Sequence, residues 1–216
     1  MPASTAAIVQ AATDEWNYWG KSTWNCITGA KSTGYHIDDD VPYAKYIINK
    51  YLALFYNPPT AGPSVQDIAG DVYPWSAVTI SYIMKTAGFT KEEFPFSQAH
   101  AKYLVWGIKN RNDEVQNAAY WGYRVDDDLA LPDVGDLVGC ARAEHRLTRD
   151  EALAYFARTG SYASHSDIVV AKRPGEIDVI GGNVRDSVTK KTLKLNAKGQ
   201  LIDNLHDWFV VLRRHN

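Results

Sequence analysis

The chain changes character near residue 130, from segments with a helical spacing of apolar residues to short apolar runs separated by turns. Helical spacing marks residues 4–20, 40–58, 76–88 and 98–108, with one later helix at 148–160. Ser4 or Thr5 can cap the first of these helices and Ser97 the fourth, Thr148 and Glu151 have the spacing of a capping box, and residues 21–39 indicate a loop. Strand signals lie at 135–140, 165–171, 177–180, 192–195 and 208–212. Helices followed by strands are typical of α+β proteins. We therefore predict one domain over residues 1–216, mainly helical over 1–130 and mainly strand over 131–216, with the helices packed on an antiparallel sheet of about five strands.

Length and charge limit the partners that such a domain can have. A chain of 216 residues with 45% hydrophobic content suits one well-buried domain. Its net charge is −2 and its Lys and Arg residues are scattered singly, which disfavours nucleic acid and anionic membranes as partners. The first residues lack the basic and apolar pattern of a signal peptide, and no stretch is long enough to span a bilayer. We expect a protein made in the cytoplasm without a cleaved signal.

The two cysteines, Cys26 and Cys140, lie far apart and outside any Cys-x-x-Cys or Cys/His spacing. Neither a zinc site nor a disulfide scaffold is indicated, and we expect free thiols. For Cys140, a buried structural thiol is favoured over a place in a cleft. Since no metal-ligand cluster and no Gly-rich phosphate loop is apparent, the sequence predicts neither a metal nor a cofactor.

A small hydroxyl residue, Ser76, stands at the start of the apolar helix expected over residues 76–88. The first amides of a helix lack intrahelical partners and carry partial positive charge, so they can activate a nucleophile and hold a developing oxyanion. Serine is also a common helix N-cap, a role that needs no catalysis. Both uses of Ser76 are open at this point, and the neighbouring Trp75 suits either a cleft wall or the core.

Two residues of the expected sheet have the chemistry to assist Ser76. A nucleophilic serine needs a base within hydrogen-bond reach and a polar group that orients the base. His165 begins one strand, and Asn183 closes the next strand after two glycines. An antiparallel pair joined at the Pro174-Gly175 turn would bring both residues to one end of the sheet. A structural histidine and a plain Gly-Gly-Asn turn are the alternatives.

Several short motifs recur in a fixed order along the chain: Glu15-Trp16, Pro74-Trp75-Ser76-Ala77, Ser97-Gln98-Ala99-His100, Pro132-Asp133-Val134-Gly135-Asp136-Leu137, His165-Ser166-Asp167-Ile168-Val169 and Gly181-Gly182-Asn183-Val184. Their order resembles that of papain-fold cell-wall hydrolases of the NlpC and CHAP kinds. It is closer still to that of an uncharacterised bacterial domain family grouped with those hydrolases. The likeness covers nearly the whole chain.

The resemblance implies a papain-like α+β fold with Ser76 at the nucleophile position, His165 as general base and then acid, and Asn183 as the orienting residue. Trp75, His100 and Asp167 are the candidate substrate-binding residues, with an ordinary helix-surface role as the alternative for His100. Most papain-fold hydrolases have Cys at the position of Ser76. A hydroxyl must lose its proton during attack and therefore depends more on base geometry than a thiol does.

Together these features predict a peptidoglycan hydrolase, an amidase or endopeptidase that cleaves an amide bond by acyl transfer. One alternative is an inactive papain-fold module that binds cell-wall peptide or a partner protein. Another is a serine hydrolase or acyltransferase acting on a different ester or amide. Without a signal peptide, a cell-wall hydrolase reaches its substrate by phage lysis or by secretion into the periplasm of a neighbouring cell. An antibacterial effector toxin with an immunity or delivery protein is the hypothesis that follows.

Overall fold

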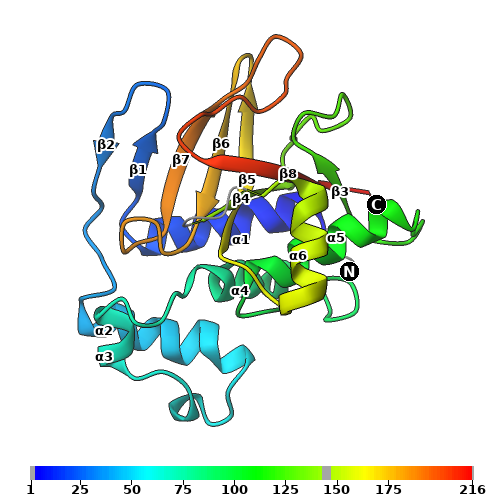
Figure 1. Ribbon diagram of the computed structural model, residues 1–216. Helices are drawn as coiled ribbons and strands as arrows, with labels where there is room; N and C mark the ends of the chain where they lie inside the picture. Colours follow the sequence, from blue (N-terminus) through cyan, green and yellow to red (C-terminus); the bar gives the residue numbers. More distant parts are fainter. Residues whose placement is uncertain (1–2, 143–146, 216) are drawn as a thin grey trace.

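A mixed α+β fold is seen in the computed structural model, which describes residues 3–142 and 147–215. Its eight-stranded sheet has the order β2-β1-β7-β6-β5-β4-β8-β3 (Figure 1). The bounds are β1 Ser22–Asn25, β2 Lys31–Ser32, β3 Tyr120–Arg124, β4 Leu137–Ala141, β5 Ser164–Arg173, β6 Glu176–Gly181, β7 Thr189–Lys194 and β8 Asp207–Arg214. The prediction of an α+β fold is confirmed.

The sheet is larger than the sequence pattern predicts. The five expected strands correspond to β4 to β8, and β1, β2 and β3 are additional strands from the first part of the chain. The β1 strand pairs in parallel with β7, whereas the other neighbouring strands are antiparallel. The β8 strand lies beside β4 rather than β7, so the sheet is not a simple meander. The expectation of a five-stranded antiparallel sheet was therefore wrong.

The described helices are α1 Thr5–Tyr18, α2 Val41–Tyr46, α3 Val65–Ala69, α4 Ser76–Thr86, α5 His100–Asn112 and α6 Arg149–Thr159. Short π and 3-10 turns, Ile47–Tyr51 and Leu52–Leu54, continue α2, and a further 3-10 turn covers Pro59–Ala61. As predicted, Ser4 caps α1, and Thr148 with Glu151 forms the capping box of α6. None of the described helices has the length and apolar character needed to cross a bilayer.

The main core lies between one face of the sheet and helices α1, α4 and α5, with α6 packed on α5 (Figure 1). Strand residues alternate between the two faces. In β4, Leu137 belongs to this core, whereas Val138 belongs to a second apolar cluster on the opposite face. Ile168 and Val169 divide in the same way in β5. Because of this alternation, consecutive residues near the start of β5 lie on opposite sides of the sheet.

Candidate active site

Ser76 is the first residue of α4, and its hydroxyl faces a histidine. The N-cap of the helix is Trp75, which makes no side-chain cap, so the N-cap interpretation of Ser76 was wrong. Instead, Ser76 Oγ lies 2.7 Å from His100 Nε2. Ser76 is 3% exposed and His100 is 4% exposed, so little water competes for this contact. The structure thus brings a hydroxyl and an imidazole into hydrogen-bond contact at the start of a buried helix.

Two serines set the position of His100 relative to Ser76. His100 begins α5 two residues later than predicted, and Ala99, rather than Ser97, is its N-cap. The Ser97 amide donates to Ser81 Oγ, and the Ser81 hydroxyl donates to the Ser97 carbonyl, each at 2.9 Å. Because Ser81 lies on α4, this reciprocal pair fixes the chain before α5 against the helix that carries Ser76.

The second nitrogen of His100 is surrounded by hydroxyl groups. Nδ1 lies 2.9 Å from Ser166 Oγ and also contacts the Tyr103 hydroxyl, and those two hydroxyls are 3.1 Å apart. In the tautomer that donates from Nδ1 to Ser166, Nε2 is free to accept the Ser76 proton. Burial, reinforced by the neighbouring His165, lowers the pKa of His100 well below its usual value. His100 is therefore neutral near pH 7 and has the protonation state of a general base.

His165 belongs to a separate buried network. Its Nε2 donates to Asp167 Oδ1 at 3.0 Å, and Asp167 Oδ2 lies 2.8 Å from Lys191 Nζ. Burial acts to raise the pKa of Asp167, but the charges of Lys191 and His165 outweigh it and hold that pKa well below its usual value. Asp167 has no exposed surface and Lys191 is 1% exposed, so this is a fully buried ion pair. Asp167, rather than the predicted Asn183, is the orienting partner of His165.

The Gly181-Gly182 pair permits this packing. A Cβ at Gly181 would lie 1.9 Å from Asp167 Oδ1 and 3.0 Å from His165 Nε2, and a Cβ at Gly182 would lie 2.4 Å from Thr79 Oγ1. Because β6 runs between β5 and β7, the missing side chain of Gly181 lets Asp167 reach across β6 toward Lys191. Both glycines therefore allow neighbouring side chains to pack directly against the backbone.

Replacing Gly181 with alanine is expected to lower the free energy of unfolding by about 1–3 kcal/mol, the usual cost of overpacking. The added methyl group would displace the Asp167 carboxylate from His165. Urea denaturation of the variant and the wild type measures the difference. Gly181 does not have a positive φ, so the loss can be attributed to the contacts of the added methyl group and not to backbone strain. A Gly181→Ala protein as stable as the wild type would contradict this account of the packing.

The two histidine groups lie side by side. The rings of His100 and His165 are 5.0 Å apart between centroids and tilted by 55°. His165 and Asn183 line the same cavity, so the prediction that the turn brings them to one end of the sheet is confirmed. Among the described residues, however, the hydrogen bond of Ser76 goes to His100 and that of His165 goes to Asp167. The predicted Ser76, His165 and Asn183 therefore do not form a continuous hydrogen-bonded triad.

Two cavities meet near Arg142, which lines both. The larger, about 550 Å³, is lined by Ser76, His100 and residues 161–164. The smaller, about 320 Å³, is lined by His165, Asn183, Lys191, Cys140 and His206, among others. Tyr162 also lines the larger cavity, but its hydroxyl is buried and, among the described residues, has no hydrogen-bond partner. Its ring packs against Tyr155, Phe156 and Phe209, so Tyr162 contributes to the wall of this cavity through its ring.

The remaining sequence-predicted residues lie in the core. Trp75 has no exposed surface, stacks on Trp19 at 4.9 Å and donates to Asp38 Oδ2 at 2.6 Å. It therefore packs in the core and does not form a cleft wall. Asp167 is equally buried and orients His165, so it does not face a substrate. Cys140 is a free, 2% exposed thiol whose pKa burial raises to about 12.

Sequence reasoning missed several members of these networks. Ser166 lies within the His165-Ser166-Asp167 motif but was given no role there, and Tyr103 and Lys191 belong to none of the motifs. Only their contacts identify them, those of Ser166 and Tyr103 with His100 and that of Lys191 with Asp167. The place of His100 beside Ser76 could be suspected from its position at the start of a helix, but its partner could not. A further group formed by Cys26, Asp203 and His206 was also missed, because its members come from opposite ends of the chain.

The fold and this site define an α+β domain with a buried Ser–His pair at the start of a helix. The chain belongs to the bacterial family described as "Uncharacterized protein conserved in bacteria (DUF2272)", whose match spans residues 56–214. No curated protein and no solved structure matches the chain. Membership of this family assigns no activity, and the likeness to papain-fold hydrolases rests on the sequence motifs alone.

Proposed function

We propose that the protein is a serine hydrolase of the papain-like class that cleaves an amide bond of peptidoglycan by acyl transfer, with Ser76 as nucleophile and His100 as general base. The 2.7 Å contact between Ser76 Oγ and His100 Nε2 carries this proposal. It meets the distance requirement for proton transfer from a nucleophile to its base. His100 thereby takes the role that the resemblance assigned to His165, and His165 with Asn183 remains the alternative base and orienting pair.

In the acylation step, Ser76 Oγ attacks the carbonyl carbon of the amide while its proton passes to His100 Nε2. The tetrahedral intermediate then collapses, the C–N bond breaks, and His100 returns the proton to the leaving amine. Water, deprotonated by the same nitrogen, cleaves the resulting ester and regenerates the Ser76 hydroxyl. The hydroxyls of Ser166 and Tyr103 hold the imidazole at Nδ1 throughout.

The start of α4 supplies donors for the negative charge that develops on the carbonyl oxygen. The α-helical hydrogen bonds of α4 begin at Thr79, whose amide donates to the Trp75 carbonyl at 3.2 Å. The amides of Ser76, Ala77 and Val78 precede that first bond, at the positive end of the helix. Amides of this kind, beside the nucleophile, are the usual donors of an oxyanion hole.

Peptidoglycan is the substrate that the sequence motifs favour, and the cavity has features that suit a peptide. Arg142 lines it and can pair with the carboxylates that cell-wall peptides carry. Delivery as an antibacterial effector into the periplasm of a target cell, with an immunity protein in the producer, is part of the same proposal. Toxicity that appears only when the protein is directed to the periplasm would support it, and no toxicity in either compartment would count against it.

Purified protein incubated with peptidoglycan tests the proposal. Release of soluble fragments by the wild type supports a hydrolase, and the fragment masses identify the bond that is cut. If the wild type releases none but binds peptidoglycan in a pull-down assay, the inactive binding module is the correct alternative. A Ser76→Cys variant that gains activity absent from the wild type would also favour that alternative, since it would show that the cleft retains only the geometry for a thiol.

The pH profile provides a separate check that a buried histidine is the base, since burial lowers the pKa of both His100 and His165. Protonated His100 cannot accept the Ser76 proton, and its pKa is lowered by burial and by His165, with Arg142 and Lys191 acting in the same direction and Asp167 opposing them. The acid limb of kcat/KM is therefore expected below pH 6.5, the ordinary histidine value. Measurement of kcat/KM across the acid range locates this limb, and a midpoint at or above 6.5 would contradict His100 as the base.

A further inference from the structure

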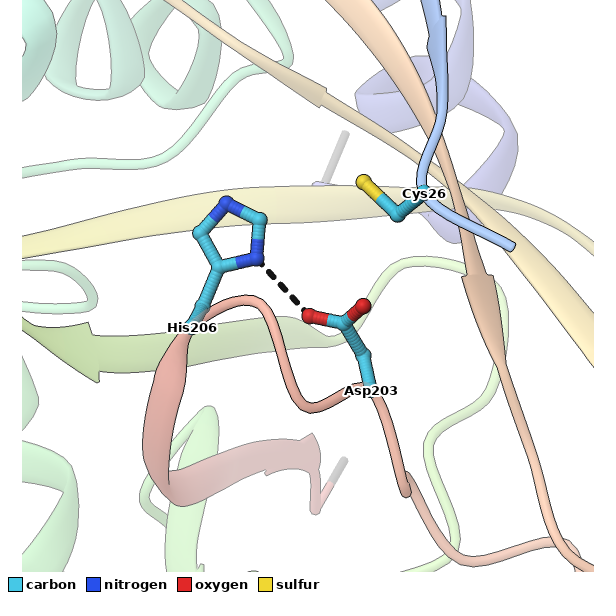
Figure 2. A group of neighbouring side chains, drawn as sticks. All are labelled: Cys26, Asp203 and His206. Carbon is cyan, nitrogen blue, oxygen red and sulfur yellow. Dashed lines mark hydrogen bonds and ion pairs between the residues drawn. The ribbon is translucent and has the colours of Figure 1, made fainter. Parts of the chain in front are cut away.

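Three side chains with different donor atoms converge at a place separate from Ser76. Cys26 follows β1, whereas Asp203 and His206 lie in the segment that leads into β8. The Cys26 sulfur, an Asp203 oxygen and a His206 ring nitrogen all lie within 4.8 Å of one another. Figure 2 shows the thiol directed toward the gap beside the Asp203–His206 contact. We propose that Cys26, Asp203 and His206 bind a divalent transition-metal ion, for which zinc is the best match; this inference does not depend on the hydrolase proposal.

Both segments are anchored to β7, which explains how residues from opposite ends of the chain meet. The Cys26 amide donates to the Thr192 carbonyl at 3.0 Å, and the Ile202 amide donates to the Lys194 carbonyl at 3.0 Å. Thr192 and Lys194 are two residues apart in β7, so both carbonyls face the side of β7 on which β1 lies. The backbone, rather than the side chains, therefore sets the distance between the donors. The group is therefore held in place before any ion binds.

Neighbouring tryptophans orient the side chains of Asp203 and His206. The Trp208 indole donates to Asp203 Oδ2 at 2.8 Å, and His206 Nδ1 lies 2.8 Å from the same oxygen. The His206 ring lies 5.4 Å from the Trp24 ring and 5.1 Å from the Trp208 ring, between centroids. A hydrogen bond to a ligating carboxylate from outside the coordination shell is common in metal sites. Trp208 and Trp24 thus restrict both side chains to the positions from which they can share an ion.

The donor set favours zinc over the other common divalent ions. A thiolate, an imidazole and a carboxylate together are typical of zinc, whereas calcium and magnesium prefer oxygen ligands only. Three protein ligands leave a fourth tetrahedral position for water or another small ligand. His206 also lines the smaller cavity, which gives an ion a path from solvent. On binding, Cys26 releases its thiol proton to solvent and the Nδ1 proton of His206 moves to Nε2, so that sulfur, nitrogen and oxygen each bond to the ion.

The test uses the full chain, freed of metal with a chelator, kept reduced, and titrated with Co²⁺ and then with Zn²⁺. We expect one Co²⁺ per chain, a sulfur-to-cobalt charge-transfer band, visible bands of tetrahedral cobalt, and loss of both on addition of Zn²⁺. Zinc alone should raise the Tm of the wild type, because an ion that binds only the folded state stabilises it. None of these readouts requires enzymatic activity.

Variants decide whether these residues are the ligands. In Cys26→Ser the charge-transfer band should disappear, and in His206→Gln the affinity for Co²⁺ should fall by at least about 100-fold, the upper range for loss of an outer-shell partner. Cys140→Ser, which removes the other thiol near the same cavity, should retain the band and the Tm increase. The Tm of each metal-free variant shows whether it is folded. A wild type that binds no Co²⁺, or a band that survives in folded Cys26→Ser, would overturn the proposal.

Discussion

Ser76→Ala is expected to reduce the release of soluble peptidoglycan fragments by at least about 10⁴-fold, because loss of a nucleophile from a serine–histidine pair removes the covalent route. The variant should fold normally, since the change removes one oxygen atom and leaves His100 bonded to Ser166. Fragment release from purified peptidoglycan, followed over time at equal protein concentration, provides the measurement. Thr86→Ala, at an exposed position on the same helix, serves as the control and should retain full activity.

The two histidines provide the discriminating comparison for that experiment. His100→Gln should lower activity by about 10²–10⁴-fold if His100 is the general base. His165→Gln should have a smaller effect, because His165 contacts Asp167 instead of Ser76. The reverse order would return the role of base to His165, as the sequence motifs imply. Equal activity of Ser76→Ala and the wild type would remove Ser76 from the mechanism altogether.

Lys191→Met is expected to lower the free energy of unfolding by about 3–5 kcal/mol, the usual cost of breaking a buried ion pair. The variant leaves the Asp167 carboxylate buried with only the His165 hydrogen bond to compensate its charge. Urea denaturation at neutral pH measures the loss. The direction of the Asp167 pKa shift also predicts a pH dependence of stability. Because the pKa of Asp167 is lower in the folded protein than its ordinary value of about 3.8, the ion pair stabilises the fold above pH 3.8, and this stabilisation is lost as the pH falls below that value.

An exposed ion pair gives the matched control for this change. Lys198 pairs with Asp128 at 3.2 Å, with side chains 71% and 80% exposed. Lys198→Met should cost at most about 1 kcal/mol. The double variant Asp167→Leu with Lys191→Met should recover part of the loss, because no buried charge is left alone. Equal losses from Lys191→Met and Lys198→Met would contradict the importance assigned to burial.

The parts of the fold that sequence reasoning predicted are those with strong local signals. The cap of α1, the capping box of α6 and the turn at Pro174-Gly175 depend on neighbouring residues only, and all three occur as expected. The β1 and β2 strands were predicted as a loop because β1 is only partly buried and β2 is a two-residue exposed strand. Their strand conformation comes from pairing with each other and with the distant β7, which no local pattern records.

The candidate site was predictable in its location but not in its connections. Ser76, His165 and Asn183 lie at the end of the sheet beside α4, as their motifs indicate. Which histidine contacts Ser76 depends on the packing of α5 through the Ser81–Ser97 pair, a contact between side chain and backbone with no sequence signature. The partner of His165 was misassigned because Asp167, two residues along on the same strand face, reaches the His165 ring at 3.0 Å.

The segment before residue 56 lies outside the family match, yet it completes the molecule. The β1 strand covers the edge of β7, and Trp19 of α1 stacks on Trp75, the residue next to Ser76. A protein that began at the family boundary would expose β7 as an unpaired sheet edge, a surface prone to aggregation. It would also lose Trp19, whose ring packs against Trp75 at the start of α4. In this chain, the region that defines the family and the region that packs together are therefore different lengths of sequence.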